Sequence, residues 1–197
     1  MFASWTERDS TGSTPIHKLA RSGRLNQVPE YLLVQRNLML QDNDGKTPLY
    51  EAAYNGHLEQ MPFEVLTSEN MLLRTKSGDS ALHSAARAGQ LDKVPVSMLT
   101  VENLLVQYVF EETRPNWPPI NKYLENGHSD LKESGVWRTP LYWVVLNGVL
   151  DQIPLGLEFP ETVKILVGDE WWERNQAVLN KKAELGTSTE SVEVELF

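Results

Sequence analysis

Four histidines and one neighbouring acid are the residues whose types could support acid–base catalysis or bind a metal ion. His17, His57 and His83 lie in the first half of the chain, and His128 stands two residues before Asp130. A histidine–carboxylate pair needs a third group and a pocket before it can catalyse a reaction, and the sequence indicates neither. We therefore expect no catalytic residues and no metal ligands.

Other chemistries are excluded by what the sequence lacks. The chain has no cysteine, so it has no disulfide, no thiolate zinc site and no cysteine nucleophile. Glycine-rich phosphate and dinucleotide loops, the H-E-x-x-H zinc motif and the G-x-S-x-G nucleophile elbow are also absent. The sequence predicts a protein that is not an enzyme and needs no cofactor.

Three of the histidines belong to a pattern that recurs along the chain. A glycine stands at positions 23, 56, 89 and 148, and a proline at positions 29, 62, 95 and 154. Both markers are spaced by 33, 33 and 59 residues, which indicates four repeats with 26 extra residues between the third and the fourth. Each repeat must stack on its neighbours to bury its apolar face.

The residues before each glycine predict a short helix. Each helix begins with a residue that can cap its N-terminus, and three of the four continue with a proline, which suits the first helical position because it lacks an N–H. These pairs are Thr14–Pro15, Thr47–Pro48, Ser80–Ala81 and Thr139–Pro140. Small residues such as Ala53 and Ala86 let neighbouring helices pack closely, and the glycine ends the helix in a left-handed turn.

This pattern resembles the ankyrin repeat, whose signature is T-P-L-H-x-A-A and whose period is 33 residues. The resemblance covers residues 9–107 and 137–157 and implies an all-α solenoid of about four repeats. In ankyrin repeats the histidine of the signature hydrogen-bonds to neighbouring loops, and tyrosine can replace it, which implies a structural role in place of metal binding. Here that position holds His17, Tyr50, His83 and Tyr142.

The second half of each repeat departs from the usual ankyrin form. A proline four residues after the leucine of the G-x-L turn should delay or break the second helix. Thr67 and Thr100 then offer new N-caps, each with an acid in the following turn. We expect two short helical pieces in place of one long helix. The Leu-Thr-x-Glu-Asn segments at 66–70 and 99–103 resemble bacterial ankyrin arrays, which implies a bacterial or phage source.

An insertion at residues 108–134 interrupts the array, which otherwise spans residues 1–157. Its three prolines and Trp117 favour an ordered, turn-rich loop. Insertions in solenoids project from one face, often the binding face, so we expect this loop to take part in binding. The alternative is an insertion without a role.

The chain after the array predicts a cap and a tail. Residues 158–186 should form a helical cap that covers the exposed core at the end of the stack. Its main helix is expected to have Asp169 as N-cap and Gly186 just past its end, with the pair Trp171 and Trp172 on the covering side or, alternatively, bound to a partner. Residues 187–197 form an acidic tail, either frayed or a short linear motif.

The net charge of −9 is uneven along the chain. Residues 1–107 carry −2, residues 108–134 carry −2, and residues 158–197 carry −5. An acidic chain of this kind argues against direct binding to nucleic acid or to anionic membranes. No apolar run approaches the roughly 18 residues of a membrane span, and no signal peptide is recognisable at the start. We expect a cytoplasmic protein that does not bind membranes.

The resemblance to ankyrin repeats also implies where a partner would bind. Such arrays present a concave surface built from loop fingers and the exposed side of the first helices. Tyr54, Arg21 and Arg87 are the expected anchors because Tyr and Arg are enriched among binding hot spots. The full set of expected contacts is Arg21, Asn43, Asp44, Lys46, Tyr54, Asn55, Lys76, Asp79 and Arg87, with Trp117 in the insertion and Arg138 in the fourth finger.

We therefore expect a protein–protein interaction module that is a monomer and binds another protein. The main alternative is an acidic inhibitor, of a phage or bacterial anti-defence type, that imitates nucleic acid and blocks the basic groove of a host protein. Such binding would collapse with rising salt. A third possibility is a passive array whose partner is another copy of itself.

Overall fold

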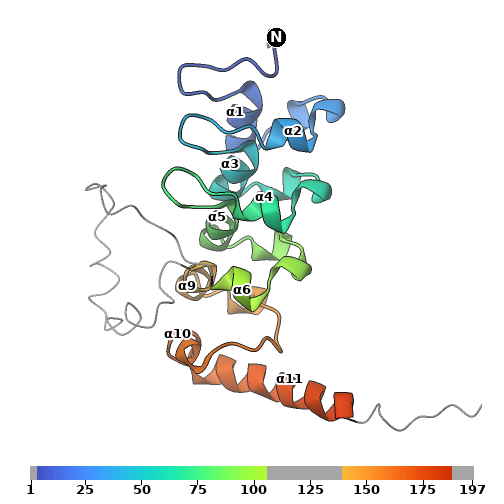
Figure 1. The fold of residues 1–197 in the computed structure, drawn as a ribbon, viewed down its shortest axis with the longest axis vertical. Coiled ribbons are helices and arrows are strands. Elements are labelled where there is room, and N and C mark those ends of the chain that lie inside the picture. The colour runs from blue at the N-terminus through green and yellow to red at the C-terminus, as the bar shows by residue number, and fades with distance from the viewer. Residues whose placement is uncertain (1–3, 106–138, 188–197) are drawn as a thin grey trace, which may run out of the picture.

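The structure is a computed structural model, and it describes residues 4–105 and 139–187. Helices stack in one direction from the N-terminus to the last helix, and three loops project from one side of the stack (Figure 1). The described residues form helices and no β-strand beyond one isolated bridge, between Arg74 and Ser80. The insertion at 108–134, with Trp117, and also Arg138 and the tail beyond Thr187 lie outside the described residues.

The first helix of each repeat lies against the first helix of the next. The four helices are α1 (Pro15–Arg21), α3 (Pro48–Asn55), α5 (Ala81–Arg87) and α9 (Pro140–Leu146). The four predicted residues stand at the N-cap positions. The Thr47 and Thr139 hydroxyls accept from the N–H groups of Tyr50 and Tyr142, at 3.0 and 3.2 Å, whereas the Ser80 side chain makes no such bond. A glycine with positive φ follows each helix, as the repeat predicts. A Cβ at Gly23 would lie 2.8 Å from the His57 ring, so this turn has room only for glycine.

The second half of each complete repeat contains three short pieces, where the sequence predicted two. A 3-10 turn precedes the proline, a second 3-10 turn follows it, and a short α-helix comes last. The pieces are η1 (Leu25–Gln27), η2 (Glu30–Leu32) and α2 (Gln35–Leu38), then η3 (Leu58–Gln60), η4 (Phe63–Val65) and α4 (Ser68–Leu72), then η5 (Leu91–Lys93), η6 (Val96–Met98) and α6 (Val101–Leu104). The proline breaks the helix because it lacks an N–H and forces the preceding residue into extended backbone.

The caps of these last helices are as predicted. The Thr67 hydroxyl accepts from the Asn70 N–H at 3.3 Å, and the Thr100 hydroxyl accepts from the Asn103 N–H at 3.2 Å. The asparagine side chains also hold the preceding 3-10 turn, since Asn70 donates to the Val65 carbonyl at 2.9 Å. Asn37 and Asn103 make the same bond in their repeats.

A glutamine ladder joins each repeat to the one before it. The Gln60 side chain accepts from the Leu25 N–H at 2.9 Å and donates to the Gly23 carbonyl at 2.7 Å, so it satisfies the turn after α1. Gln90 and Gln152 bind the next two turns in the same way. In the third repeat Lys93 replaces the ladder glutamine, and Gln90, three residues earlier, takes over its bonds.

The fourth repeat continues the stack after the insertion. It consists of α9 and the 3-10 turn η7 (Leu150–Gln152). The Asn147 side chain donates to the carbonyls of Ala86 and Arg87, at 3.1 and 2.7 Å, and Gln152 binds the turn of the third repeat. The described part of the fourth repeat is therefore attached directly to the third.

Three elements follow the fourth repeat: η8 (Glu161–Val163), α10 (Lys164–Val167) and α11 (Asp169–Thr187). The predicted limits of the last helix are wrong, because Asp169 is its first residue and Gly186 lies inside it. Gly168 immediately before it has φ 79°, which places a glycine turn with positive φ between α10 and α11. None of the described helices is long and apolar enough to cross a membrane.

The last helix shares the core of the stack. Trp171 is buried and packs edge-on against Phe159, with 5.9 Å between the ring centroids. Asn175 is fully buried, accepts from the Gly156 N–H at 2.7 Å and donates to the Leu157 carbonyl at 2.8 Å. The hydrophobic core is continuous from α1 to α11.

Candidate functional site

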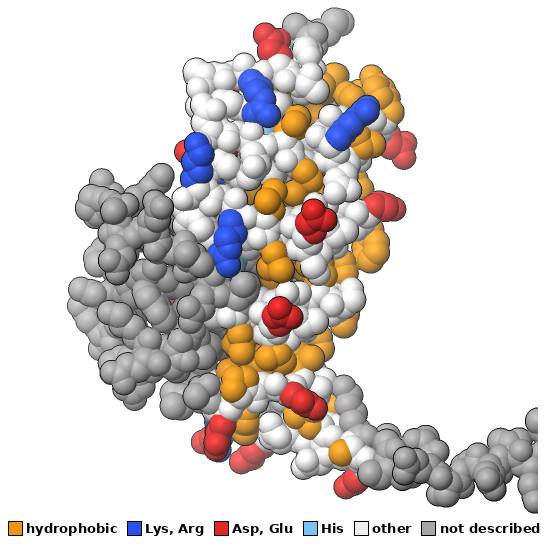
Figure 2. All heavy atoms as spheres, in the orientation of Figure 1, with side chains coloured by type: hydrophobic (Ala, Val, Ile, Leu, Met, Phe, Trp, Pro, Cys, Tyr) orange, Lys and Arg blue, Asp and Glu red, His pale blue; other side chains and the backbone are white. Residues whose placement is uncertain are grey.

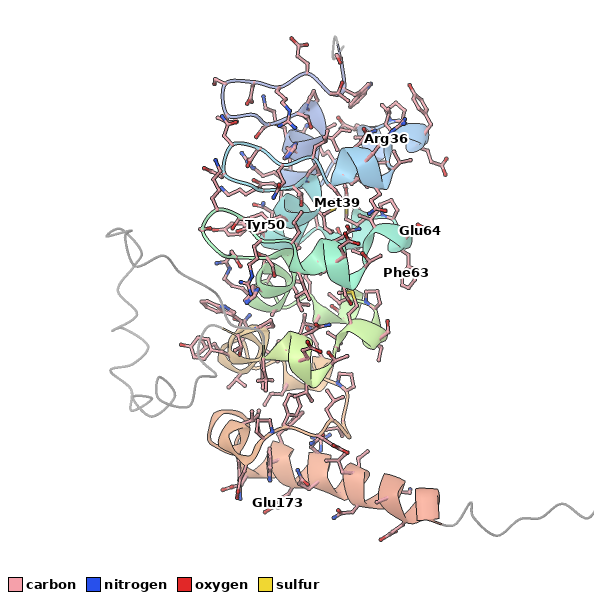
Figure 3. All side chains as sticks on the ribbon, viewed as in Figure 1. Arg36, Met39, Tyr50, Phe63, Glu64 and Glu173 are labelled. Atoms are coloured by element: carbon pink, nitrogen blue, oxygen red, sulfur yellow. The ribbon has the colours of Figure 1, made fainter. Side chains whose placement is uncertain are left out.

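An open groove of about 410 Å³ lies between helices α1 and α3 and two loop fingers, the second (residues 41–47) and the third (residues 74–80). Seven of the residues expected to bind a partner line this groove: Arg21, Asp44, Lys46, Tyr54, Asn55, Lys76 and Asp79. Tyr50, Glu51 and Ser77 complete the lining. Figure 3 shows Tyr50 on the side of the stack from which the fingers project. We call this feature the concave groove.

The fingers hold their side chains on a rigid backbone. In the second finger the Asp42 carboxylate accepts from the N–H groups of Asp44 and Lys46, both at 2.9 Å. The Lys76 N–H of the third finger donates to the Asp44 carbonyl at 2.8 Å, which fixes neighbouring fingers to each other. Hydrogen bonds of this kind preorganise the groove, which lowers the cost of ordering it on binding.

Asn43 also lies in a finger, but its role differs from the one predicted. It is exposed, and it does not line the groove. Its backbone N–H donates to the Thr11 carbonyl at 2.9 Å, and its side chain donates to the Ser10 carbonyl at 3.1 Å. Asn43 joins the first two fingers.

Arg21 is held by a carboxylate that the sequence reading missed. Its guanidinium forms two hydrogen bonds to Glu51, at 2.9 and 2.8 Å, and the Glu51 side chain is buried. The hydrogen bonds that Arg21 donates to the Glu51 carboxylate raise the pKa of Arg21. The Asn55 side chain donates to the Glu51 carbonyl at 2.8 Å. A signal existed in the sequence, since Arg21 and Glu51 occupy first helices of consecutive repeats and have opposite charge.

Asp79, one of the expected partner contacts, lines the groove but is buried. Only 2% of the residue is exposed. Its carboxylate accepts hydrogen bonds from the Tyr50 hydroxyl and the Ser80 N–H, both at 2.9 Å, and Arg87 Nη2 lies 3.7 Å away. Burial raises the pKa of Asp79, and Arg87 and the hydrogen bonds oppose that shift. The Asp79 side chain points into the protein, where Tyr50, Ser80 and Arg87 compensate its buried carboxylate.

Arg87, which the sequence predicted as an anchor for the partner, makes its contacts with residues of its own chain. Besides its ion pair with Asp79, its guanidinium carbon lies 4.4 Å from the ring centroid of Tyr54 and 5.7 Å from that of Trp143. Arg87 Nη2 is buried and has no hydrogen-bond partner among the described residues. Arg87 therefore positions Tyr54 and neutralises Asp79.

Tyr54 is the exposed aromatic side chain of the groove, since Tyr50 is buried. Half of it is exposed, and its ring lies 5.9 Å from the ring of Tyr50. Contacts with the Tyr50 ring and with the Arg87 guanidinium limit its rotamers. Of the three predicted anchors, Tyr54 alone combines exposure with a hydrophobic ring at the groove.

A sequence model described as ankyrin repeats in three copies matches residues 2–63 and 30–108, more than half of the chain. The chain belongs to the ankyrin repeat family. Ankyrin repeats are generally protein–protein interaction modules and are generally not enzymes. No curated protein matches the chain in a sequence search.

The ankyrin histidine position is structural, as the resemblance implied. His17 Nδ1 lies 2.8 Å from the Thr14 hydroxyl, and its Nε2 lies 3.2 Å from the Lys46 carbonyl in the next ankyrin finger. Burial lowers the pKa of His17, which favours the neutral ring. Within residues 4–105 and 139–187, no group of three or more histidine, aspartate or glutamate side chains is placed to hold a metal ion.

Proposed function

We propose that this ankyrin array binds another protein through the concave groove and has no catalytic activity. The observation that carries the proposal is Tyr54, which is half exposed at the groove and contacts both the Tyr50 ring and the Arg87 guanidinium. A tyrosine that is already ordered loses little side-chain entropy on binding and can bury a large apolar area. The family supports the same function.

The charges of the groove indicate the chemistry of the partner segment. Three acidic side chains line the groove: Glu51 and Asp79 are buried and paired with arginines, and the exposed Asp44 is paired with Lys46. Lys76 is exposed and forms no ion pair with any described residue. The first halves of the three complete repeats (8–23, 41–56 and 74–89) contain seven basic and five acidic residues. We expect the partner segment to be acidic, with an apolar side chain against Tyr54.

The test compares two pairs of substitutions, one in the groove and one outside it. Tyr54→Ala with Lys76→Ala changes the groove, and Leu73→Ala with Lys93→Ala removes an exposed apolar and an exposed basic side chain outside it. The groove pair should abolish capture of the partner, and the control pair should retain it. Equal capture by both pairs would overturn the proposal. Arg87→Ala is a poor test, because it leaves the Asp79 carboxylate buried without its cation.

We also propose that the insertion at residues 108–134 and the residues just before α9 contribute to partner binding. Trp117 and Arg138 are the residues concerned. Deleting residues 108–134 should weaken capture less than the Tyr54→Ala and Lys76→Ala pair does if the groove is the main surface. Complete loss on deletion alone would assign the main surface to the insertion. We also propose that the chain acts as a cytoplasmic monomer, with residues 158–186 as the cap of the array at 1–157.

One observation favours the acidic-inhibitor alternative. Six acidic side chains are exposed near the C-terminal end of the stack: Glu158, Glu161, Asp169, Glu170, Glu173 and Glu184. Figure 2 shows acidic side chains gathered at this end. If this end imitates nucleic acid, Glu170→Lys with Glu173→Lys should abolish binding, and affinity should fall steeply with salt. If the partner binds in the concave groove instead, the Glu170→Lys and Glu173→Lys pair and a rise in salt should each change the affinity only slightly.

A further inference from the structure

A second surface lies on the edge of the stack opposite the fingers. Tyr31, Phe63 and Val96 are exposed there by 73%, 71% and 71%. Figure 3 shows Phe63, with its neighbour Glu64, at this edge, away from Tyr50. Each of the three residues belongs to the 3-10 turn that follows the repeat proline, η2, η4 or η6. We call these three side chains the apolar ladder.

The proline that breaks the second helix creates the ladder. The chain turns outward at Pro29, Pro62 and Pro95, and the first or second residue after each proline is apolar and points away from the core. An exposed tyrosine, phenylalanine and valine thus occur in the same 3-10 turn of three successive repeats, with Tyr31 one position later than Phe63 and Val96. Single exposed apolar side chains, by contrast, are ordinary. Soluble proteins rarely leave a row of apolar side chains exposed without a partner.

The surroundings of the ladder are acidic. The second halves of the three complete repeats (24–40, 57–73 and 90–105) contain three basic and six acidic residues, whereas the first halves carry a net positive charge. Glu30 precedes Tyr31, and Glu64 follows Phe63, and both carboxylates are exposed. Figure 2 shows acidic side chains among hydrophobic ones along this edge, and Arg36, labelled in Figure 3, is an exposed basic residue towards its N-terminal end. A partner for this surface must therefore combine apolar and basic side chains.

The fourth repeat shows what kind of element covers this position. Leu155 follows Pro154 as Phe63 follows Pro62, yet it is partly buried and packs against the core. It lines a hollow of about 340 Å³ together with Trp171 and Arg174 of α11. A helix of the chain itself thus lies beside the ladder position in the fourth repeat.

The spacing of the ladder also matches a helix. Packed helices in successive repeats lie about 8–10 Å apart, and seven residues of an α-helix rise about 10.5 Å. Apolar residues at every seventh position of a helix that runs along the stack would therefore meet Tyr31, Phe63 and Val96 in turn. We propose that the apolar ladder binds a basic amphipathic helix of a partner protein, independently of the concave groove.

The proposal is tested with a peptide probe and the full chain. The probe is a peptide of three heptads with leucine at every seventh position, lysine on both flanks of the leucine face and alanine elsewhere. A control peptide has the same composition with the leucines distributed around the helix. Fluorescence anisotropy of each labelled peptide gives its affinity. The wild-type chain should bind the probe at least about tenfold more tightly than the control peptide.

Two sets of variants assign the binding to the ladder. Tyr31→Ser with Phe63→Ser should weaken probe binding at least about tenfold, whereas Tyr54→Ser in the concave groove should leave it within about twofold. Glu30→Gln with Glu64→Gln should weaken binding and reduce its dependence on salt. Circular dichroism should show all variants folded, because the substituted side chains are exposed.

Three results would overturn the proposal. The wild-type chain could bind both peptides equally, or Tyr31→Ser with Phe63→Ser could bind the probe as tightly as the wild type. Sedimentation velocity could also show a dimer that dissociates in this double variant, which would assign the ladder to a second copy of the chain. The peptide test does not depend on the concave groove. If the groove variants still captured the partner, the groove proposal would fail and the ladder proposal would be unaffected.

Discussion

The Arg21 guanidinium and the Glu51 carboxylate form two hydrogen bonds, at 2.9 and 2.8 Å, across the boundary between the first two ankyrin repeats. Arg21 is half exposed at the groove, whereas Glu51 is buried beneath it. The arginine therefore presents a fixed face to a partner and at the same time compensates a buried charge. Residues of the groove serve both binding and stability, and the following predictions separate the two roles.

Removing Arg21 should destabilise the fold. Arg21→Ala leaves the Glu51 carboxylate buried without its cation, and because Arg21 is half exposed the expected loss is about 1–3 kcal/mol in the free energy of unfolding. Urea unfolding measures it. Lys18→Ala removes an exposed partner of Asp9 from the same helix and should leave the free energy of unfolding nearly unchanged. Equal stability of the two variants would contradict the assigned role of Glu51.

The glutamine ladder offers a matched pair of substitutions. Gln60→Ala removes two hydrogen bonds to the turn after α1 and leaves the Leu25 N–H without its partner, which should cost about 1–3 kcal/mol. Gln27 occupies the same position in the first repeat, where it is exposed. Gln27→Ala should change the free energy of unfolding by less than about 0.5 kcal/mol. If both substitutions cost the same in urea unfolding, the ladder does not join the repeats.

Asp79 should make the stability depend on pH. Burial raises its pKa in the folded chain above the value of about 3.9 for an unfolded aspartate. Because the folded chain then holds this proton more tightly, the contribution of Asp79 to stability is largest below pH 4 and falls as pH rises through the raised pKa. Stability relative to the Asp79→Asn variant should therefore decrease as pH rises from 4 to 7. Parallel stability curves for the two proteins would contradict the shift.

The last helix should unfold together with the repeats. Asn175→Ala removes three hydrogen bonds to the backbone of residues 156 and 157 from a fully buried site, at an expected cost of about 2–4 kcal/mol. Asn180→Ala, on the exposed side of the same helix, should have little effect. Hydrogen exchange should show loss of protection in α9 as well as α11 in the first variant. Loss confined to α11 would mean that it does not cap the array.

The repeat pattern made the stack and its helix starts predictable, because a threonine cap and a proline at the first helical position each have a local physical cause. Asp79 was assigned to the surface because counting positions within a repeat does not tell which way a side chain turns. Its burial depends on Tyr50 and Arg87, which come from neighbouring helices. The role of Gln90 could not be predicted from the repeat pattern either. Lys93 occupies the position of Gln60 but cannot accept a hydrogen bond, so Gln90, at a different position, makes the bonds to the turn after α3.

The central claim is that the concave groove binds the partner, and calorimetric titration of the captured partner tests it most directly. Tyr54→Ala with Lys76→Ala should weaken the affinity at least about tenfold, whereas Leu73→Ala with Lys93→Ala should leave it within about twofold. Both pairs should unfold at the same urea concentration as the wild type. A groove variant that is folded and binds the partner as tightly as the wild type would contradict the account.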